Sequence, residues 1–186
     1  MNLSNSQKKI VSNVAWSLGG KAVNMASALF VGILVARYLG PESYGLMNYV
    51  ISYVAIFSII ATFGMDNIEI RELSRQNDKK DAIMGTCFCL RMFFATIAYI
   101  VIAISLFYFQ TDKFTSLMVL AYGLTLFTGT GNLLRNYFTS IVQNKYIVKS
   151  EMYRTFVGAG IKILLLWIKA PLEYFIYAQI FDTALV

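Results

Sequence analysis

The segment from Ser12 to Gly45 reads SNVAWSLGGKAVNMASALFVGILVARYLGPESYG, a long apolar run followed by a polar turn. The run contains one cation, Lys21, and residues 22–36 carry no charge. It stops at the sequence Arg37 to Gly45, and a second apolar run begins directly afterwards. A helix of about 20 mostly apolar residues is long enough to cross a bilayer. The segment therefore predicts a membrane hairpin with a tight polar turn, and the rest of the chain repeats this design.

The composition indicates a membrane protein. Of the 186 residues, 58% are hydrophobic and 14% are charged, and the mean hydropathy is +0.60. A soluble domain is closer to a quarter charged. A chain this apolar lacks the polar surface needed to face water on all sides, so a multi-span helical membrane protein fits it better.

The hydropathy pattern predicts an all-α, multi-pass membrane protein, a bundle of six transmembrane helices in one domain, residues 1–186. The expected spans are about 13–36, 44–65, 84–109, 115–138, 151–168 and 172–186. We expect the first span to stay uncleaved, because its apolar run is long for a signal peptide and further spans follow. The sixth run is short and contains Asp182, so we expect the chain to end inside a truncated last helix.

Basic residues favour one end of these hairpins. With the N-terminus inside, the outer turns hold three Lys or Arg residues, which are Arg37, Lys113 and Lys169. The inner segments hold ten: Lys8, Lys9, Arg71, Arg75, Lys79, Lys80, Arg135, Lys145, Lys149 and Arg154. Because cytoplasmic loops of membrane proteins are enriched in Lys and Arg, we expect a cytoplasmic N-terminus. The same bias explains the net charge of +6 without nucleic acid as a partner.

Two polar segments connect the middle spans. Residues 66–81 are charged, and Ile68, Ile70 and Leu73 give them a weak amphipathic pattern. They fit a short helix at the membrane interface or a solvated loop, and the pattern does not separate these two interpretations. The second segment, residues 143–149, is expected to be a polar loop.

Apart from Arg135 and Arg154, which lie at the inner ends of their spans, three cations fall inside the expected spans: Lys21, Arg91 and Lys162. A charge at the middle of a bilayer costs about 2.5–3.5 kcal/mol on insertion scales. Lys21 and Arg91 lie near the cytoplasmic ends of their helices, where long side chains can reach the interface. Lys162 lies nearer to the centre, where this is harder. An alternative for all three is a water-filled cavity between the helices.

Polar stripes at helical spacing favour the cavity. The first span carries Asn13, Ser17, Lys21, Asn24 and Ser27 on one face, and the fourth carries Thr125, Thr128, Asn132 and Asn136. Such faces suit other helices or water rather than lipid. We expect a cavity lined by Ser17, Asn24, Thr128 and Asn132, with Lys21, Arg91 and Lys162 as its cations. This charge suits an anionic ligand such as phosphate or pyrophosphate, because Arg donates forked hydrogen bonds and Lys acts as a point charge.

No motif for ATP, a cofactor or a catalytic metal is recognisable. Gly20 and Lys21 lack the first glycine and the hydroxyl residue of a P-loop. The chain has no His, and its two cysteines, Cys87 and Cys89, form a C-x-C in an apolar run. This context favours a role in the membrane core over a redox pair or a zinc site. We therefore expect no cofactor, no metal and no enzyme activity.

The turn Ala36-Arg37-Tyr38-Leu39-Gly40-Pro41-Glu42-Ser43-Tyr44-Gly45 resembles the A-R-x-L-G-P-x-x-Y-G signature that joins the first two helices of polysaccharide biosynthesis transporters. These are the Wzx-type flippases of lipid-linked oligosaccharides, in the MATE-like MOP exporter superfamily. The resemblance runs from about Ser12 to the C-terminus and includes the Gly64-Met65-Asp66 end of the second span and Arg91 early in the third. Its signature residues are Arg37, Gly40, Pro41, Tyr44 and Gly45.

The resemblance implies the N-terminal half of a transporter with two six-helix bundles. Such a transporter moves an undecaprenyl-pyrophosphate-linked oligosaccharide, a repeat unit of O-antigen, capsule or exopolysaccharide, across the bacterial inner membrane by alternating access. The implied partners are the lipid bilayer, this anionic lipid-linked oligosaccharide, other polysaccharide assembly proteins, and a second bundle from a missing C-terminal half or another chain. The resemblance also implies that Lys21 and Arg91 contact the pyrophosphate, and that Arg37 caps the turn or lies at an interface.

Two other functions stay open at this point. A MATE-type drug or cation antiporter needs carboxylates in its cavity, whereas the expected spans hold three cations and one acid well inside a run, Asp182. A non-transporting half-transporter scaffold would fit a chain that ends at Val186. The downstream reading frame distinguishes this scaffold from one half of a complete transporter.

Overall fold

The computed structural model describes residues 5–75, 77–109, 112–141 and 144–185, and within these ranges the side chains of 5–17, 77 and 144–146 are left out. Every regular element in the described residues is helical, which confirms the all-α prediction. The elements are α1 Asn5–Thr62, α2 Met65–Arg75, η1 Asn77–Lys79, α3 Lys80–Tyr108, α4 Lys113–Gly123, α5 Thr125–Thr128, η2 Gly129–Gly131, α6 Asn132–Ser140, α7 Asn144–Trp167 and α8 Leu172–Ala184.

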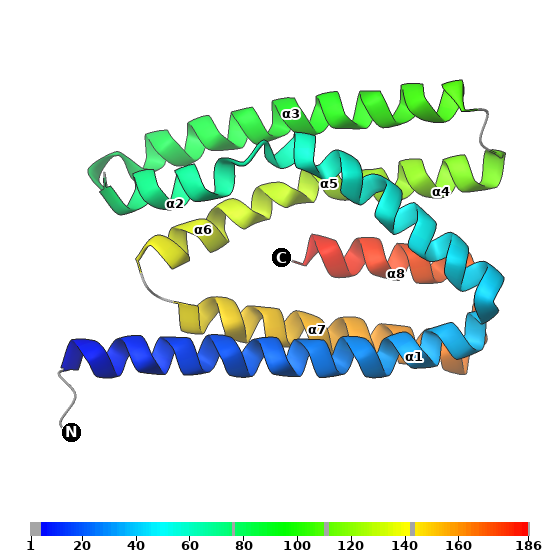
Figure 1. Ribbon diagram of the computed structural model, residues 1–186, viewed down its shortest axis with the longest axis horizontal. Coiled ribbons are helices and arrows are strands. Elements are labelled where there is room, and N and C mark those ends of the chain that lie inside the picture. Colours follow the sequence, from blue (N-terminus) through cyan, green and yellow to red (C-terminus); the bar gives the residue numbers. More distant parts are fainter. Residues whose placement is uncertain (1–4, 76, 110–111, 142–143, 186) are drawn as a thin grey trace.

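The helix α1 contains the predicted hairpin turn. Gly40, with φ 73° and ψ 173°, is non-helical and divides α1 into two arms. Pro41 opens the second arm, a position where its missing N–H is not needed for the helix. Only glycine adopts the Gly40 backbone conformation at little cost. The chain therefore runs out along the first arm and returns along the second (Figure 1).

Replacing Gly40 by Ala is expected to lower the free energy of unfolding by about 1–3 kcal/mol, the cost of a strained backbone. No atom lies within 4 Å of the added Cβ, so the backbone alone causes the loss. Thermal unfolding of the detergent-purified protein measures it. Gly45→Ala is the matched control, because Gly45 has a negative φ and its Cβ also meets no atom within 4 Å. Equal stability of the two variants would contradict the glycine requirement.

The turn is tied to the connection between α7 and α8. The Tyr38 hydroxyl donates a hydrogen bond to the Ala170 carbonyl over 3.2 Å, and the Tyr38 ring lies 5.9 Å from the Phe175 ring. Tyr44 packs against the cluster of buried residues that contains Ala170 and Phe175, whereas Arg37 is exposed. The signature turn is thus a structural contact between the first hairpin and the last helices.

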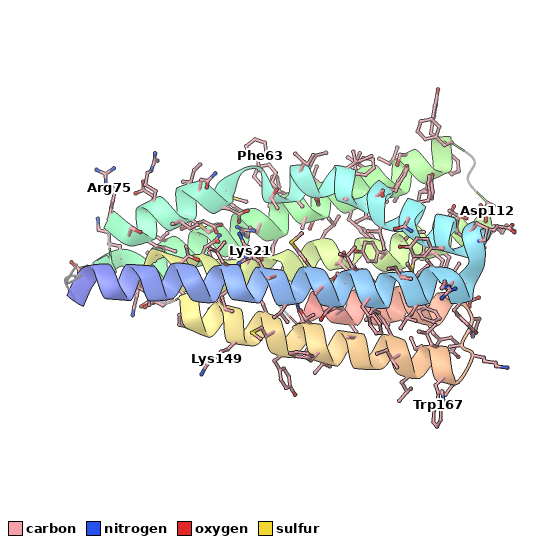
Figure 2. The ribbon with its side chains drawn as sticks, turned by 60° about the horizontal axis from the view of Figure 1, so that its bottom comes forward. Lys21, Phe63, Arg75, Asp112, Lys149 and Trp167 are labelled. Carbon is pink, nitrogen blue, oxygen red and sulfur yellow. The ribbon has the colours of Figure 1, made fainter. Side chains whose placement is uncertain are left out.

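Most connections gather at two opposite ends of the bundle, whereas the α1–α2 connection at Phe63 lies between these ends (Figure 2). Figure 1 shows the N-terminus with the α2–α3 and α6–α7 connections at one end, and the Gly40 turn with the α3–α4 and α7–α8 connections at the other. Arg75 and Lys149 mark the first end in Figure 2, and Asp112 and Trp167 mark the second. At the second end, the Asp112 carboxylate accepts a 2.9 Å bond from the Thr115 N–H, which caps α4 and lowers the pKa of that carboxyl.

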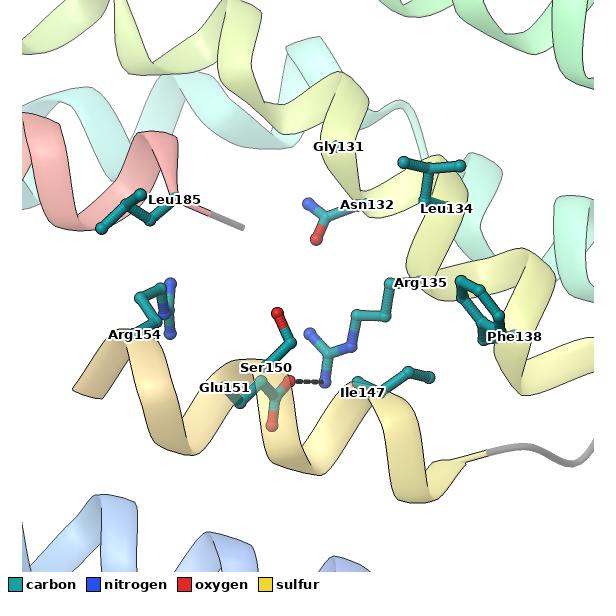
Figure 3. A pocket seen from close by; sticks show the side chains of 10 residues that line it. All are labelled: Gly131, Asn132, Leu134, Arg135, Phe138, Ile147, Ser150, Glu151, Arg154 and Leu185. Atoms are coloured by element: carbon teal, nitrogen blue, oxygen red, sulfur yellow. Dashed lines mark ion pairs between the residues drawn. The ribbon is translucent and has the colours of Figure 1, made fainter. Parts of the chain in front are cut away.

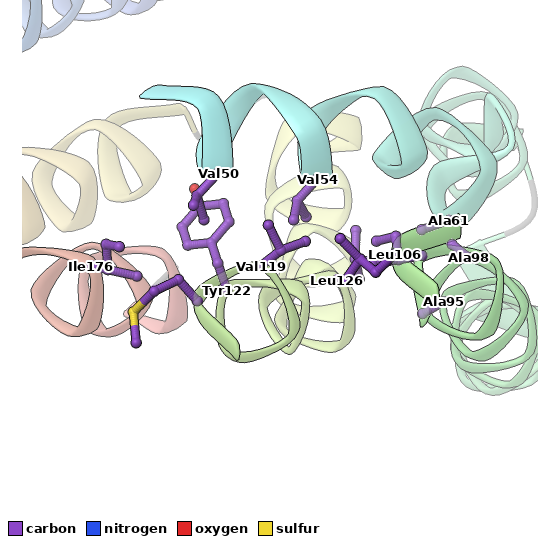
Figure 4. Packing of buried hydrophobic residues seen from close by; sticks show 12 residues of the cluster. Val50, Val54, Ala61, Ala95, Ala98, Leu106, Val119, Tyr122, Leu126 and Ile176 are labelled. Carbon is purple, nitrogen blue, oxygen red and sulfur yellow. The ribbon is translucent and has the colours of Figure 1, made fainter. Parts of the chain in front are cut away.

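In the part of the chain that the structure describes, two apolar clusters hold the helices together. The larger joins the second arm of α1 to α3, α4, α5 and α8 (Figure 4). The smaller joins the first arm of α1 to α7 and α8. The larger contains Val50, Val54, Ala61, Ala95, Ala98, Ile102, Leu106, Met118, Val119, Tyr122, Leu126 and Ile176, and the smaller Val31, Val35, Leu165, Ala170, Phe175 and Ala178. The first arm of α1 packs against α7, and the second arm packs against α3. The helix α1 therefore links the two clusters.

The polar connecting segments are more helical than expected. The charged stretch 66–81 holds α2, so the helical alternative is confirmed there, but its buried residues are Met65, Glu69 and Leu73. The polar loop expected at 143–149 is wrong for most of its length: Gln143 lies outside the described residues, and α7 begins at Asn144. Lysine has nearly the same helix propensity as leucine, so Lys145 and Lys149 do not end a helix that the adjoining apolar run supports.

Among the described residues, three helical stretches are long and apolar enough to cross a membrane: Leu18–Arg75, which includes the Gly40 turn, Lys80–Tyr108 and Lys113–Ser140. α7 carries Glu151, Arg154 and Lys162, and α8 has 13 residues. At 1.5 Å per residue, α8 spans only about 20 Å of a hydrocarbon core about 30 Å thick. The count of six spans therefore stays a prediction.

Candidate functional site

A cavity of about 650 Å³ lies between α6 and α7 (Figure 3). Most of its lining comes from these two helices, and Leu185, after the end of α8, closes one side. The lining residues are Gly131, Asn132, Leu134, Arg135, Phe138, Ile147, Ser150, Glu151, Arg154 and Leu185. A cavity of this volume accommodates a small organic ligand. We call it the α6–α7 cavity.

Two arginines and one carboxylate supply the charge of the α6–α7 cavity. Arg135 Nη2 lies 3.1 Å from Glu151 Oε1, and this ion pair joins α6 to α7. Arg154 is partly buried, and its Nε is buried without a hydrogen-bond partner among the described residues. Figure 3 shows the Arg135, Arg154 and Asn132 side chains entering the space between the helices. Among the described lining residues there is thus one more positive than negative charge.

A second cavity, of about 290 Å³, lies between the second arm of α1 and the broken helix α4–α6. Thr128 and Asn132 are among its lining residues, together with Ser58, Thr62 and Thr183. Asn132 lines both cavities. The fourth expected span is interrupted here by the 3₁₀ turn η2, which brings its polar stripe to both spaces.

Arg91 lies in a buried ion network rather than in the lining of either cavity. Its Nε and Nη2 donate 2.7 and 2.8 Å bonds to the two carboxylate oxygens of Glu69. Nη2 also bonds Asp66 Oδ1 at 2.5 Å, and Nη1 bonds the Gly129 carbonyl at 3.3 Å. The Asn136 amide donates to both carboxylates, at 2.6 Å to Glu69 and 3.0 Å to Asp66. The network therefore joins α2, α3, η2 and α6.

Lys162 pairs with Asp182, the acid well inside the sixth expected span. Its Nζ lies 3.2 Å from Asp182 Oδ2, and both side chains are 20% exposed. Asp182 rests on α7 at Gly158, where an added Cβ would lie 2.8 Å from Asp182 Oδ1. The absence of a side chain at Gly158 thus leaves the space in which Asp182 reaches Lys162.

Replacing Gly158 by Ala is expected to displace the Asp182 carboxylate and to cost about 1–3 kcal/mol of stability, as overpacking does. Gly160→Ala is the control, because its Cβ meets no atom within 4 Å. Thermal unfolding of both variants in detergent measures the difference. In an Asp182→Ser background the smaller side chain leaves room, so the cost of Gly158→Ala should shrink. An unchanged cost in that background would contradict the contact.

Lys21 and Asn24 share a face of α1 but have different surroundings. The Thr155 hydroxyl on α7 donates a 2.7 Å bond to Asn24 Oδ1. Lys21 is exposed, and no described carboxylate lies within 4 Å of its Nζ. In Figure 2 its side chain extends from α1 on the side where α2 and α3 lie. The side chain of Ser17 lies outside the described residues.

The structure therefore separates the residues that the sequence placed in one cavity. Thr128 and Asn132 line cavities, whereas Arg91 and Lys162 each hold a carboxylate and Asn24 bonds α7. Sequence reasoning missed Arg135 and Arg154 as cavity residues, because it assigned both to the inner segments. Their signals were the spacing of three between Asn132 and Arg135 and between Glu151 and Arg154, which puts each pair on one helix face.

The distribution of apolar and polar side chains shows which class of protein this is. Large apolar side chains cover the outside: Phe30 is 63% exposed, Phe107 88% and Trp167 89%. An apolar surface of this kind suits lipid rather than water. Polar and charged groups are concentrated instead at helix–helix contacts and around two cavities. The chain is a helical membrane protein.

The family follows from a comparison with known proteins. The family model described as polysaccharide biosynthesis protein matches residues 10–185, and the chain belongs to this family. It is the family of Wzx-type polysaccharide flippases in the MOP superfamily, whose members are transporters rather than catalysts. No curated protein and no solved structure matches the chain. The resemblance that the Ala36–Gly45 turn indicated is thereby confirmed.

Proposed function

We propose that this protein takes part in moving a lipid-linked oligosaccharide across the bacterial inner membrane, with the pyrophosphate of the lipid as the group that its cations attract. The observation that carries the proposal is the family match over residues 10–185. The α6–α7 cavity adds support, because an excess of arginine inside an apolar bundle suits an anion better than a neutral or cationic ligand. The substrate class proposed is an undecaprenyl-pyrophosphate-linked repeat unit.

Lys21, Arg91 and Lys162 have different parts in this proposal. Among the described residues, Lys21 alone of the three has no ion-pair partner, so we assign it the direct contact with the anion. Arg91 and Lys162 already neutralise Glu69 and Asp182, and they contribute through the positive field and by keeping the helices in place. Asn24, Thr128, Asn132 and Ser17 are proposed as polar lining of the path.

Alternating access needs two halves that rock against each other around a shared site. We propose that this bundle pairs with a second bundle, supplied by the same polypeptide or by another chain. The N-terminus is proposed to be cytoplasmic, since the basic residues at Arg75 and Lys149 lie at its end of the bundle (Figure 2). The substrate would then meet the bundle first at the end where α6 and α7 are joined.

Deletion of the gene in its own bacterium tests the proposal. Loss of surface polysaccharide, restored by the gene on a plasmid, is the expected result. Sensitivity to cationic dyes with normal polysaccharide would instead identify a drug or cation antiporter. We expect no such sensitivity, because Asp182, the acid well inside the last expected span, is already paired with Lys162. Normal polysaccharide and normal dye resistance together would indicate a non-transporting scaffold.

A further inference from the structure

We infer that the α6–α7 cavity is a phosphate-type anion site in which Arg154 and Arg135 are the donors and Glu151 is a built-in counter-ion that the ligand displaces. This inference rests on the proposed function and deepens it, since it adds to the Lys21 contact a second place that binds the anionic part of the substrate, built from residues outside the three cations expected from the sequence. The site comes from two helices that are separated along the chain by the α6–α7 connection (Figure 3).

Arg154 has a hydrogen-bond donor that a ligand in the cavity could satisfy. Its Nε is buried and lacks a hydrogen-bond partner among the described residues, although it lines a cavity. A buried donor without a partner loses its hydration and gains nothing in return. A ligand oxygen in the cavity would satisfy it, and a guanidinium presents several donors in the fork geometry that matches phosphate oxygens.

The ion pair between Arg135 and Glu151 is weak enough for a ligand to displace. This ion pair is 3.1 Å long, but the Arg135 side chain is 50% exposed and that of Glu151 24%. Such a partly solvated pair is worth little and breaks readily. An anion with two negative charges in the cavity competes with the single charge of Glu151 for the same guanidinium. Displacement of Glu151 would then free Arg135 to join Arg154 at the ligand.

The size and charge of the cavity define the ligand class. Its volume is about 650 Å³, more than a phosphate or pyrophosphate alone requires, so an organic group attached to the anion also fits. Among the described lining residues, the two arginines outnumber the one carboxylate. Asn132 and Ser150 add neutral polar groups that suit the hydroxyls of a sugar. The shared chemistry is a mono- or diphosphate, carried by a lipid or free in solution.

Binding to the complete protein in nanodiscs tests the site. One arm uses inorganic pyrophosphate in solution, and the other uses a polyprenyl diphosphate in the disc. Arg154→Gln should weaken binding of the preferred ligand about tenfold or more, the loss expected for a charge-assisted hydrogen bond. Arg154→Lys, which keeps the charge but removes Nε, should weaken it less. Arg71→Gln is the control, because Arg71 lies on α2 outside the cavity, and it should leave binding unchanged.

Glu151→Gln distinguishes this site from a simple structural ion pair. Removal of the competing charge should tighten anion binding several-fold, whereas a structural bridge would show lower thermal stability and no tighter binding. Unchanged affinity in Arg154→Gln, or no binding in either arm, would overturn the site. Unchanged or weaker affinity in Glu151→Gln would overturn the role of Glu151. A failure of the proposed function would give a different result. Surface polysaccharide would stay normal after gene deletion, while the purified protein would still bind the anion.

Discussion

Replacing Arg91 by Leu is expected to destabilise the protein by about 3–5 kcal/mol, the cost of leaving a buried charge without its partner. The Arg91 side chain is 3% exposed and that of Glu69 is fully buried. Glu69 would keep the Asn136 amide as a donor, but it would lose both of its bonds to the guanidinium. The loss should appear as a large fall in the unfolding temperature of the detergent-purified protein.

Two further variants make this result specific. Arg71→Gln removes an exposed arginine whose 3.4 Å pair with Glu72 is solvated, so its effect should stay within about 1 kcal/mol. Glu69→Gln in the Arg91→Leu background removes the buried charge and should recover part of the lost stability. If Arg91→Leu were as stable as Arg71→Gln, the network would not hold α2, α3 and α6 together.

Replacing Lys21 by Ala is expected to reduce surface polysaccharide about tenfold to a hundredfold at an unchanged level of protein, the loss that a charged hydrogen bond to the substrate would cause. Lys21 has no described ion-pair partner, so its removal leaves no buried charge behind. The measurement is complementation of a gene deletion, with polysaccharide and membrane-protein levels quantified in the same cells.

Lys21→Arg and Lys113→Ala are the controls for this effect. The arginine keeps the positive charge and should retain much of the activity. Lys113, at the start of α4, is exposed and lies at the other end of the bundle, so its removal should have no effect. A fully active Lys21→Ala variant would show that Lys21 only reaches the membrane interface, as long basic side chains do near helix ends.

Local rules were sufficient to predict the helical fold and its first turn. Gly40 followed by Pro41 is the pairing of a helix end with a helix start, and the positive φ of Gly40 follows from it. The apolar runs predicted the remaining helices, because their lengths and hydropathy depend on nearby residues alone. The bounds were less accurate where polar residues continue a helix, as at Asn144.

The site was harder to predict because it depends on contacts between distant residues. Arg91 and Glu69 are 22 positions apart, and Lys162 and Asp182 are 20 apart. Counting charges within each span identified the cations, but only the packing of the helices shows which of them meet a carboxylate. The same limit applies to Arg154, whose unsatisfied Nε depends on the approach of α6 to α7.

Movement of the lipid-linked oligosaccharide between the two leaflets tests the central claim most directly. Inverted inner-membrane vesicles, prepared from cells with and without the protein, are loaded with the labelled lipid-linked sugar on the outer, cytoplasmic-facing leaflet. A membrane-impermeant reagent that oxidises sugars then reports how much remains there. We predict that the protein makes the sugar inaccessible with time and that Lys21→Ala slows this loss. Equal accessibility in vesicles with and without the protein would contradict a role in translocation.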